Sequence, residues 1–197
     1  MQNRYQSWNE YYGTVRSNYR RRLNKILQAG KGFQFEKHAC TEFTEEMHEQ
    51  YLNVYKRSSD KLEKLSFGFF KNLPADFQLT VCRKNGKILG WDIALLHAET
   101  YYFFLGGIDY SLNKEEQIYL SLLTRLIEDG INSKAHYIDL GQTAEIAKMR
   151  MGGYPKPLYM EAHHSIKLFH KILSLCSPML EYRRKLENTN AFKEVDS

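Results

Sequence analysis

The dipeptide Asn85-Gly86 separates two apolar runs, 79–83 and 87–96, and constrains the fold more than any other local signal in this chain. Asn-Gly is favoured in two-residue hairpin turns because both residues tolerate a positive φ. The sequence therefore predicts an antiparallel pair of strands. A third strand is expected at 101–108, directly after a short turn, and its dense apolar content predicts burial on both faces.

A fourth strand, 136–140, runs straight into polar residues. Gly141 frees the backbone for a turn, and Thr143 is a candidate N-cap for a helix that carries Lys148. Ligands usually lie in the crevice beyond strand ends in folds of this kind. Gln142, Thr143 and Lys148 are therefore candidates for holding a carboxylate or a phosphate. The alternative is an ordinary cap followed by a solvated lysine.

Helical patterns surround these strands. Ser7 and Glu10 form a capping box, and the apolar stripe behind it predicts one continuous helix that ends at Gly30. Asn113 with Glu116 is a second capping signal, expected to open a long helix before the fourth strand. The remaining expected elements are a first strand at 33–37, helices from 44, over 66–73, from 143 and over 166–176, a last strand at 158–162, and a frayed or partner-docked helix from 182.

This order of elements predicts an α/β fold with a mixed sheet: an antiparallel meander, then a parallel strand-helix-strand unit, with helices on both faces. With 197 residues, 43% of them hydrophobic, the chain is long enough for one domain over 1–197, with a core at about 7–176 and a polar tail at 182–197. No apolar run approaches the ~18 residues of a bilayer span, and the first ten residues lack a signal peptide's apolar region, so a cytoplasmic protein is expected. Three cysteines without a CxxC pair favour buried thiols over disulfides or a metal site.

Positive charge is concentrated near the start of the chain. Residues 1–37 hold eight lysines and arginines against two glutamates, a balance of +6, whereas the whole chain carries +5. Arg20, Arg21 and Arg22 form the sharpest cluster and are candidate contacts to the phosphates of a tRNA or a phosphate-bearing precursor. The alternative is the solvated face of an amphipathic helix.

Three segments resemble a known family. They are 18–23 (the basic helix), 85–90 (the hairpin) and 139–143 with Lys148 and Gly152 (the strand end). In order and spacing they resemble the GNAT-fold acyltransferase superfamily, in particular its Fem-type peptidoglycan aminoacyltransferase branch. The resemblance implies a transferase that moves an acyl or aminoacyl group to an amine acceptor by direct attack, in peptidoglycan biosynthesis, with acyl-CoA or aminoacyl-tRNA as co-substrate.

The resemblance also places a donor site. Members that use acetyl-CoA hold its pyrophosphate with a glycine-containing loop before the main helix, and the corresponding segment here, 109–114, has no glycine. Its helix start still offers backbone N–H groups to an anion, so Ser111, Asn113 and Lys114 are candidate donor contacts. Gly106 and Gly107 are expected to form a bulge that accepts the acyl group or its pantetheine arm; the alternative is a bulge that serves packing alone.

Direct transfer to an amine needs a base for the nucleophile and a donor for the leaving group. The predicted catalytic set is Gln142, Lys148, Asp109 and Tyr154. Further candidates are Glu161 and His163 as bases and Tyr159 as acid, while no metal site is predicted. Two other functions stay open: a ligand-binding module that keeps the fold without catalysis, and a nucleic-acid-binding protein that uses the basic helix on tRNA.

Overall fold

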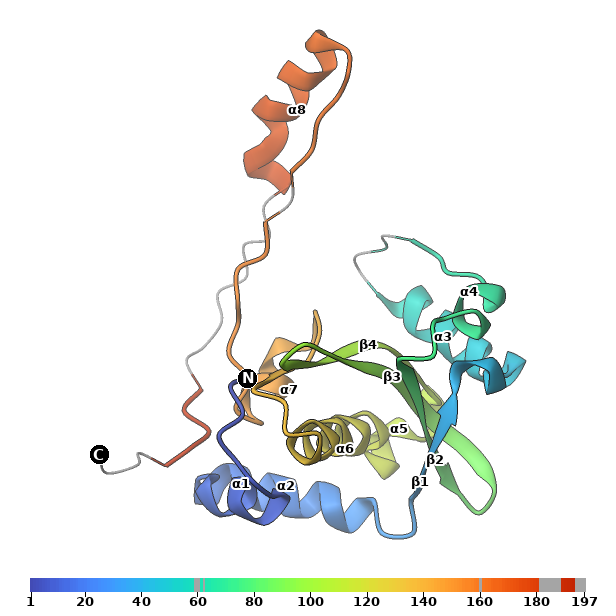
Figure 1. Ribbon diagram of the computed structural model, residues 1–197, viewed down its shortest axis with the longest axis vertical. Helices are drawn as coiled ribbons and strands as arrows, with labels where there is room; N and C mark the ends of the chain where they lie inside the picture. The colour runs from blue at the N-terminus through green and yellow to red at the C-terminus, as the bar shows by residue number, and fades with distance from the viewer. Residues whose placement is uncertain (59–60, 62, 160, 181–188, 194–197) are drawn as a thin grey trace.

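The computed structural model describes residues 1–58, 61, 63–159, 161–180 and 189–193 (Figure 1). Within them the chain forms one sheet of five strands in the order β1-β2-β3-β4-β5, in which β1 to β4 are antiparallel neighbours and β5 is parallel to β4. The mixed α/β fold predicted from the sequence is confirmed. The strands are β1 (Gln34–Ala39), β2 (Phe77–Lys84), β3 (Lys87–His97), β4 (Thr100–Ile108) and β5 (Tyr137–Asp139).

The predicted hairpin joins β2 and β3. Asn85 and Gly86 have φ values of 51° and 77°, the positive values that a two-residue turn of this kind requires. The register of β3 against β4 shifts between Ile93 and Ala94, so one residue of β4, Phe104, is left without a partner. Phe104 is 36% exposed, which corrects the expectation that β4 is buried on both faces.

Helices cover both faces of the sheet (Figure 1). On one face lie α3 (Glu45–Arg57) and α4 (Phe67–Lys71), the helices expected from 44 and over 66–73. The side chains of Thr44 and Ser66 cap their first turns. The two helices enclose the fully buried Trp91, whose indole Nε1 donates to the backbone carbonyl of Met47 at 3.0 Å. On the other face lies α6 (Ile118–Asn132), with α1 (Trp8–Thr14) and α2 (Ser17–Ala29) packed outside it.

The expected single helix at the start of the chain is two helices. Ser7 caps α1 as predicted, accepting from Glu10 N at 3.3 Å. The helix breaks at Val15 because that residue is extended and forms a β-bridge with Phe192, while Arg16 N donates to Ala191 O at 2.9 Å. Pairing with a segment near the other end of the sequence therefore interrupts a pattern that is locally helical.

The helix expected from Asn113 is also divided. It begins earlier, as α5 (Tyr110–Glu116), because Asp109 caps that end, and α6 begins after Gln117 at φ 51°. Asn113 lies inside α5 and is not the N-cap of α6, which is Gln117, although its Oδ1 accepts from Tyr119 N at 2.9 Å in the first turn of α6.

The last predicted strand, 158–162, is wrong for the residues described there, which have no regular structure. Leu158 and Tyr159 are largely exposed. The free edge of β5 is instead covered by the start of the chain, where Gln2 pairs with Tyr137 and Asn3 N donates to His136 O at 2.8 Å. A further strand therefore finds that edge occupied.

The expected helix over 166–176 is present as α8 (Lys167–Leu180), and its apolar side chains are exposed, Leu175 at 80%. Figure 1 shows α8 standing apart from the sheet and its helices. The helix expected from 182 lies largely outside the described residues. Cys40 and Cys82 are buried thiols as expected, but Cys176 on α8 is only partly buried. No described helix has the length and apolar character needed to cross a membrane.

Candidate functional site

The pairing of β4 with β5 stops after three residue pairs, at Tyr102 and Asp139, although β4 continues to Ile108. The chain leaves β5 through Gly141, whose φ is 72°, and passes directly over Phe103. A Cβ on Gly141 would lie 2.5 Å from Phe103 Cδ1, so only glycine permits this close approach. The segment behind Gly141 thus lies against β4 just where that strand loses its parallel neighbour.

Lys148 projects into this region from α7 (Glu145–Met149). Its Nζ donates to the backbone carbonyl of Gln142 at 2.6 Å and lies 5.8 Å from the centre of the Phe103 ring. The residue is only 8% exposed. Burial lowers the pKa of the Lys148 amine to about 8, while the carboxylates of Asp139 and Glu145 act in the opposite direction. The structure therefore brings together Gln142 and Lys148, two members of the predicted catalytic set.

The turn between them is strained. Thr143 and Ala144 have φ values of 61° and 49°, a region that side chains with a Cβ rarely adopt. Thr143 is not the cap of α7: the N-cap position is Ala144, and no side chain accepts a hydrogen bond there. The predicted cap is wrong because the left-handed backbone removes Thr143 from the extended conformation of an N-cap. Strained backbone of this kind is often found at functional sites.

A pocket of about 310 Å³, which we call the α7 pocket, lies between α2, α6 and α7. Arg22 and Arg150 line it together with apolar and tyrosine side chains from these helices and with Tyr11 of α1. Ala147 and Arg150, which flank Lys148 in sequence, belong to this lining, so one short helix serves both places. Two guanidinium groups beside an apolar lining suit a ligand that carries a phosphate or carboxylate on a hydrophobic group.

Only one arginine of the cluster at 20–22 reaches this pocket. Arg20 lies with its guanidinium carbon 5.9 Å from the centre of the Tyr12 ring, and Arg21 is exposed. Consecutive residues of a helix point about 100° apart, so a run of three cannot share one face. The cluster is therefore not a single contact surface.

The start of α5 holds the predicted donor contacts Ser111, Asn113 and Lys114. Asp109 Oδ1 accepts from both the backbone N and the hydroxyl of Ser111, at 2.9 and 2.5 Å, and Oδ2 accepts from Lys87 Nζ at 2.7 Å. Burial opposes ionisation of Asp109, but these hydrogen bonds from Lys87 and Ser111 prevail, and the pKa of its carboxyl is lowered. Lys114 is exposed.

These residues do not fit a pyrophosphate. Asp109 and Asn113 already accept from the backbone N–H groups of Ser111 and Tyr119, which the donor's phosphate would need. The Asp109 carboxylate also adds a negative charge where an anion would bind. The role of the segment in donor binding stays a prediction that this hydrogen bonding does not favour.

Gly106 and Gly107 do not form the predicted bulge. Both pair regularly with β3, opposite Asp92 and Trp91, and the irregularity lies at Phe104 instead. A Cβ on Gly107 would lie 2.5 Å from Trp91 Nε1, so this glycine gives room to the buried indole.

The other candidates lie in the segment between α7 and α8. Tyr154 is 48% exposed, and within the described residues it forms no hydrogen bond with Gln142 or Lys148. Glu161, His163 and Tyr159 are also exposed, and the His163 ring packs 5.0 Å from that of His170. No group of three or more potential metal ligands occurs in the part of the chain that the structure describes.

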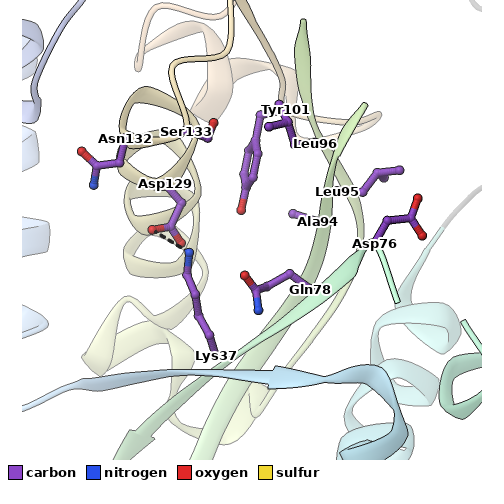
Figure 2. A pocket seen from close by; sticks show the side chains of 10 residues that line it. All are labelled: Lys37, Asp76, Gln78, Ala94, Leu95, Leu96, Tyr101, Asp129, Asn132 and Ser133. Carbon is purple, nitrogen blue, oxygen red and sulfur yellow. Dashed lines mark ion pairs between the residues drawn. The ribbon is translucent and has the colours of Figure 1, made fainter. Parts of the chain in front are cut away.

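Sequence reasoning missed a polar cluster between α6 and the sheet (Figure 2). Asp129 on α6 forms ion pairs with Lys37 of β1 at 3.4 Å and with Arg125 at 3.0 Å. Asp92 of β3 is buried beside them. Burial and then the charge of Asp129 raise the pKa of the Asp92 carboxyl to about 8, against the weaker effects of Lys37 and Arg125. The available signal was an aspartate within the otherwise apolar run at 88–96.

Comparison with protein families gives a match to the acetyltransferase (GNAT) domain over residues 13–149. A search of curated proteins gave no match.

Solved structures share the fold. An aminoglycoside acetyltransferase, meta-AAC0020 from an uncultured soil metagenomic sample, in complex with sisomicin, is similar with a TM-score of 0.50 and 11% identity, over 70% of this chain and 98% of that one. A second soil metagenomic aminoglycoside acetyltransferase, HMB0005, gives a TM-score of 0.49 and 16% identity over 68% and 99% of the two chains. Glucosamine-6-phosphate N-acetyltransferase from Arabidopsis thaliana gives a TM-score of 0.48 and 14% identity, over 66% of this chain and 97% of that one.

Proposed function

This chain belongs to the acetyltransferase (GNAT) domain family, and from that membership we propose that it transfers an acyl or aminoacyl group to a primary amine beside Lys148. One observation carries the proposal. A nearly buried lysine amine is held by the Gln142 carbonyl at the point where β4 loses its parallel partner. Nothing in the packing alone calls for an ammonium group there, because burial disfavours its charged form.

Lys148 is suited to accept a proton from the acceptor. A primary ammonium cannot attack a carbonyl, so the acceptor must first lose a proton. With a pKa of about 8, about one Lys148 side chain in ten is unprotonated at pH 7 and can take that proton. The Gln142 carbonyl then accepts a hydrogen bond from the resulting ammonium.

The acceptor nitrogen forms the new amide bond to the acyl carbon while the bond from that carbon to the leaving group breaks. The proton held on Lys148 passes to the leaving group, and the second proton that the acceptor nitrogen loses as it becomes an amide is released to solvent. No bond between enzyme and acyl group is needed, so a nucleophilic side chain has no part in the reaction.

The donor's phosphates are proposed to bind in the α7 pocket. Acyl-CoA and aminoacyl-tRNA both carry phosphates, and Arg22 and Arg150 supply two positive charges in this pocket. Arg150 follows Lys148 by two residues in the sequence. At the start of α5, by contrast, the Ser111 N–H already donates to the Asp109 carboxylate, and at the start of α6 the Tyr119 N–H donates to Asn113 Oδ1. A role in peptidoglycan biosynthesis, within the Fem-type branch, rests on the three motifs at 18–23, 85–90 and 139–143.

The test is transfer itself. Purified protein is incubated with acetyl-CoA, and separately with aminoacyl-tRNA, in the presence of a panel of primary amines, and the amide product is measured by mass spectrometry. We expect product from at least one donor and at least a ~100-fold lower rate for Lys148→Gln. Lys31→Gln, which removes an exposed lysine charge, is the matched control. An absence of product from both donors, or full activity in Lys148→Gln, would overturn the proposal.

A further inference from the structure

The helix α8 exposes an apolar face to solvent. Of the fourteen large apolar side chains that are exposed in the described part of the chain, eight lie between 154 and 175. Those on the helix itself are Leu168, Phe169, Ile172 and Leu175, which are 48–80% exposed. They have no cover because α8 stands apart from the sheet and its helices (Figure 1). Single apolar side chains are ordinary on a protein surface, whereas a concentration of them in one element marks an interaction surface.

The polar residues of α8 lie on the opposite side. Successive residues of an α-helix are about 100° apart, so Lys167, His170, Lys171 and Ser174 fall within an arc of about 100°. The apolar residues of 166–176 occupy about half of the circumference, with no polar residue among them. The apolar seam between two packed helices is narrower than this. A face this wide is typical of a helix that lies in the boundary layer of a membrane.

The charges of α8 fit an anionic surface. Lys167 and Lys171 are both exposed, and the sequence has no aspartate or glutamate from 162 to 180. Lysine ammonium groups can reach the phosphates of lipid headgroups while the apolar side chains of the same helix enter the acyl region. Each lysine near an anionic membrane surface strengthens binding to it.

The length of α8 suits a helix that lies on a bilayer. The helix has 14 residues and is therefore about 21 Å long, shorter than the hydrocarbon core of a bilayer at about 30 Å. The segment before it exposes Leu158 and Tyr159 as well. Tyrosine is enriched at the boundary between lipid and water, because its ring is apolar and its hydroxyl is polar.

We propose that α8 binds the surface of a lipid bilayer that contains anionic phospholipids, with its apolar face among the headgroups and upper acyl chains and with Lys167 and Lys171 on the phosphates. A second copy of α8 packed face to face would cover only the middle of so wide an apolar face. A bilayer covers all of it without a matched shape. The surface needs neither Lys148 nor an acyl donor, so it is independent of the proposed transfer reaction.

Binding of the full chain to lipid vesicles, measured by flotation, tests this proposal. The vesicles contain equal parts of phosphatidylglycerol and phosphatidylcholine, or phosphatidylcholine alone. We expect binding to the anionic vesicles and at least ~10-fold weaker binding to the neutral ones. Leu168→Ser combined with Leu175→Ser should weaken binding to the anionic vesicles by at least ~10-fold. The matched control makes the same change at two exposed leucines outside α8, Leu27→Ser with Leu96→Ser, and should leave binding unchanged.

The lysines are tested in the same way. Lys167→Gln combined with Lys171→Gln should weaken binding to the anionic vesicles by about tenfold and leave binding to the neutral vesicles unchanged. Lys25→Gln with Lys31→Gln removes the same charge from two exposed lysines outside α8 and should have little effect. The substituted positions on α8 are all exposed, and thermal unfolding of each variant confirms that it folds.

The proposal is overturned if the chain does not bind anionic vesicles, if it binds neutral vesicles as tightly, or if the α8 leucine variant binds as the unchanged chain does. Equal losses for the two lysine variants would assign the binding to net charge and also overturn it. Analytical ultracentrifugation without lipid tests the other occupant. A dimer that Leu168→Ser with Leu175→Ser abolishes, in a chain that does not bind vesicles, would assign the face to a second copy.

Discussion

The Nζ of Lys148 donates to the backbone carbonyl of Gln142 at 2.6 Å, across a turn in which Thr143 and Ala144 are both left-handed. This hydrogen bond fixes the amine of a nearly buried lysine beside Phe103. The backbone strain and the buried charge are both unfavourable for stability, and they occur in the same short segment. Their coincidence in one short segment is the reason why we propose that segment as part of the functional site.

The pH dependence of the free energy of unfolding should reveal the buried Lys148 amine. Burial lowers the pKa of Lys148 to about 8 from its usual 10.5, so between these pH values the unfolded chain binds more protons than the folded chain. The free energy of unfolding therefore rises with pH in this window. Lys148→Met lacks this titration and should be the more stable protein at pH 7. Its advantage should shrink above about pH 8 by up to about 1 kcal/mol per pH unit, measured by denaturant unfolding between about pH 7 and 9.5.

The rate of acyl transfer should depend on the protonation state of Lys148. If Lys148 accepts the proton, the rate of acyl transfer rises with pH toward a plateau above about pH 8. Lys148→Arg keeps the charge but cannot release a proton near neutral pH, so it should lose transfer while it still binds the donor. A pH profile that is flat between pH 6 and 9 would remove Lys148 from this role.

The arginine cluster should separate into members with different effects. All three side chains are exposed, but Arg22 and Arg150 line the α7 pocket and Arg21 does not. We expect Arg22→Gln and Arg150→Gln each to weaken the binding of coenzyme A or tRNA by about tenfold. Each variant should also make the affinity less dependent on salt concentration, because a complex with one phosphate contact fewer releases fewer counterions when it forms.

Arg21→Gln is the matched control, since it removes the same charge from the neighbouring position of the same helix. Titrations at two or more salt concentrations measure both effects. Equal losses for Arg21→Gln and Arg22→Gln would indicate a diffuse electrostatic contribution and no specific phosphate contact.

Much of the sheet was predictable because its signals are local. The Asn85-Gly86 turn, the helices that follow 44 and 66 and the strand before Gly141 each depend on a few neighbouring residues, and all are present. The helix break at Val15 was not predictable, because it depends on pairing with Phe192. The strand expected at 158–162 failed for a similar reason, since residues near the start of the chain cover the edge of β5.

The candidate site also has parts that were predictable from the local sequence and parts that were not. The position of Lys148 after a buried strand was visible in the sequence, but its burial depends on Phe103 and the path of the chain through Gly141. The cluster of Asp92, Tyr101 and Asp129 joins three elements, and no spacing along the chain connects them. Only the unusual aspartate in an apolar strand pointed to it.

Two glycines should respond to alanine in opposite directions. A Cβ on Gly107 would lie 2.5 Å from Trp91 Nε1, and the indole cannot move aside easily because it is fully buried and bonded to Met47 O. Gly107→Ala should lower the free energy of unfolding by about 2 kcal/mol or more.

Gly13, inside α1, has no atom within 4 Å of the place that a Cβ would take. Gly13→Ala should therefore raise stability by about 0.5–1 kcal/mol. Denaturant unfolding measures both, and a Gly107→Ala protein as stable as the unchanged chain would reopen a functional reason for that glycine.

Asp92 should make the folded chain less stable as the pH rises. Burial and the neighbouring Asp129 raise the pKa of the Asp92 carboxyl to about 8 from its usual 3.8, so between these values the folded chain binds more protons than the unfolded chain. Its contribution to the free energy of unfolding therefore falls as the pH rises through this window. The substitution Asp92→Asn isolates this effect, because asparagine is nearly the same size and does not ionise.

We expect Asp92→Asn to be similar in stability to the unchanged chain near pH 4.5 and more stable by about 1 kcal/mol or more near pH 7.5, measured by denaturant unfolding at both values. Asp76→Asn, which makes the same substitution at an exposed position, is the matched control. A stability difference for Asp92→Asn that stays constant between these two pH values would mean that Asp92 is ionised throughout. It would then be paired more strongly with Lys37 or Arg125 than the structure indicates.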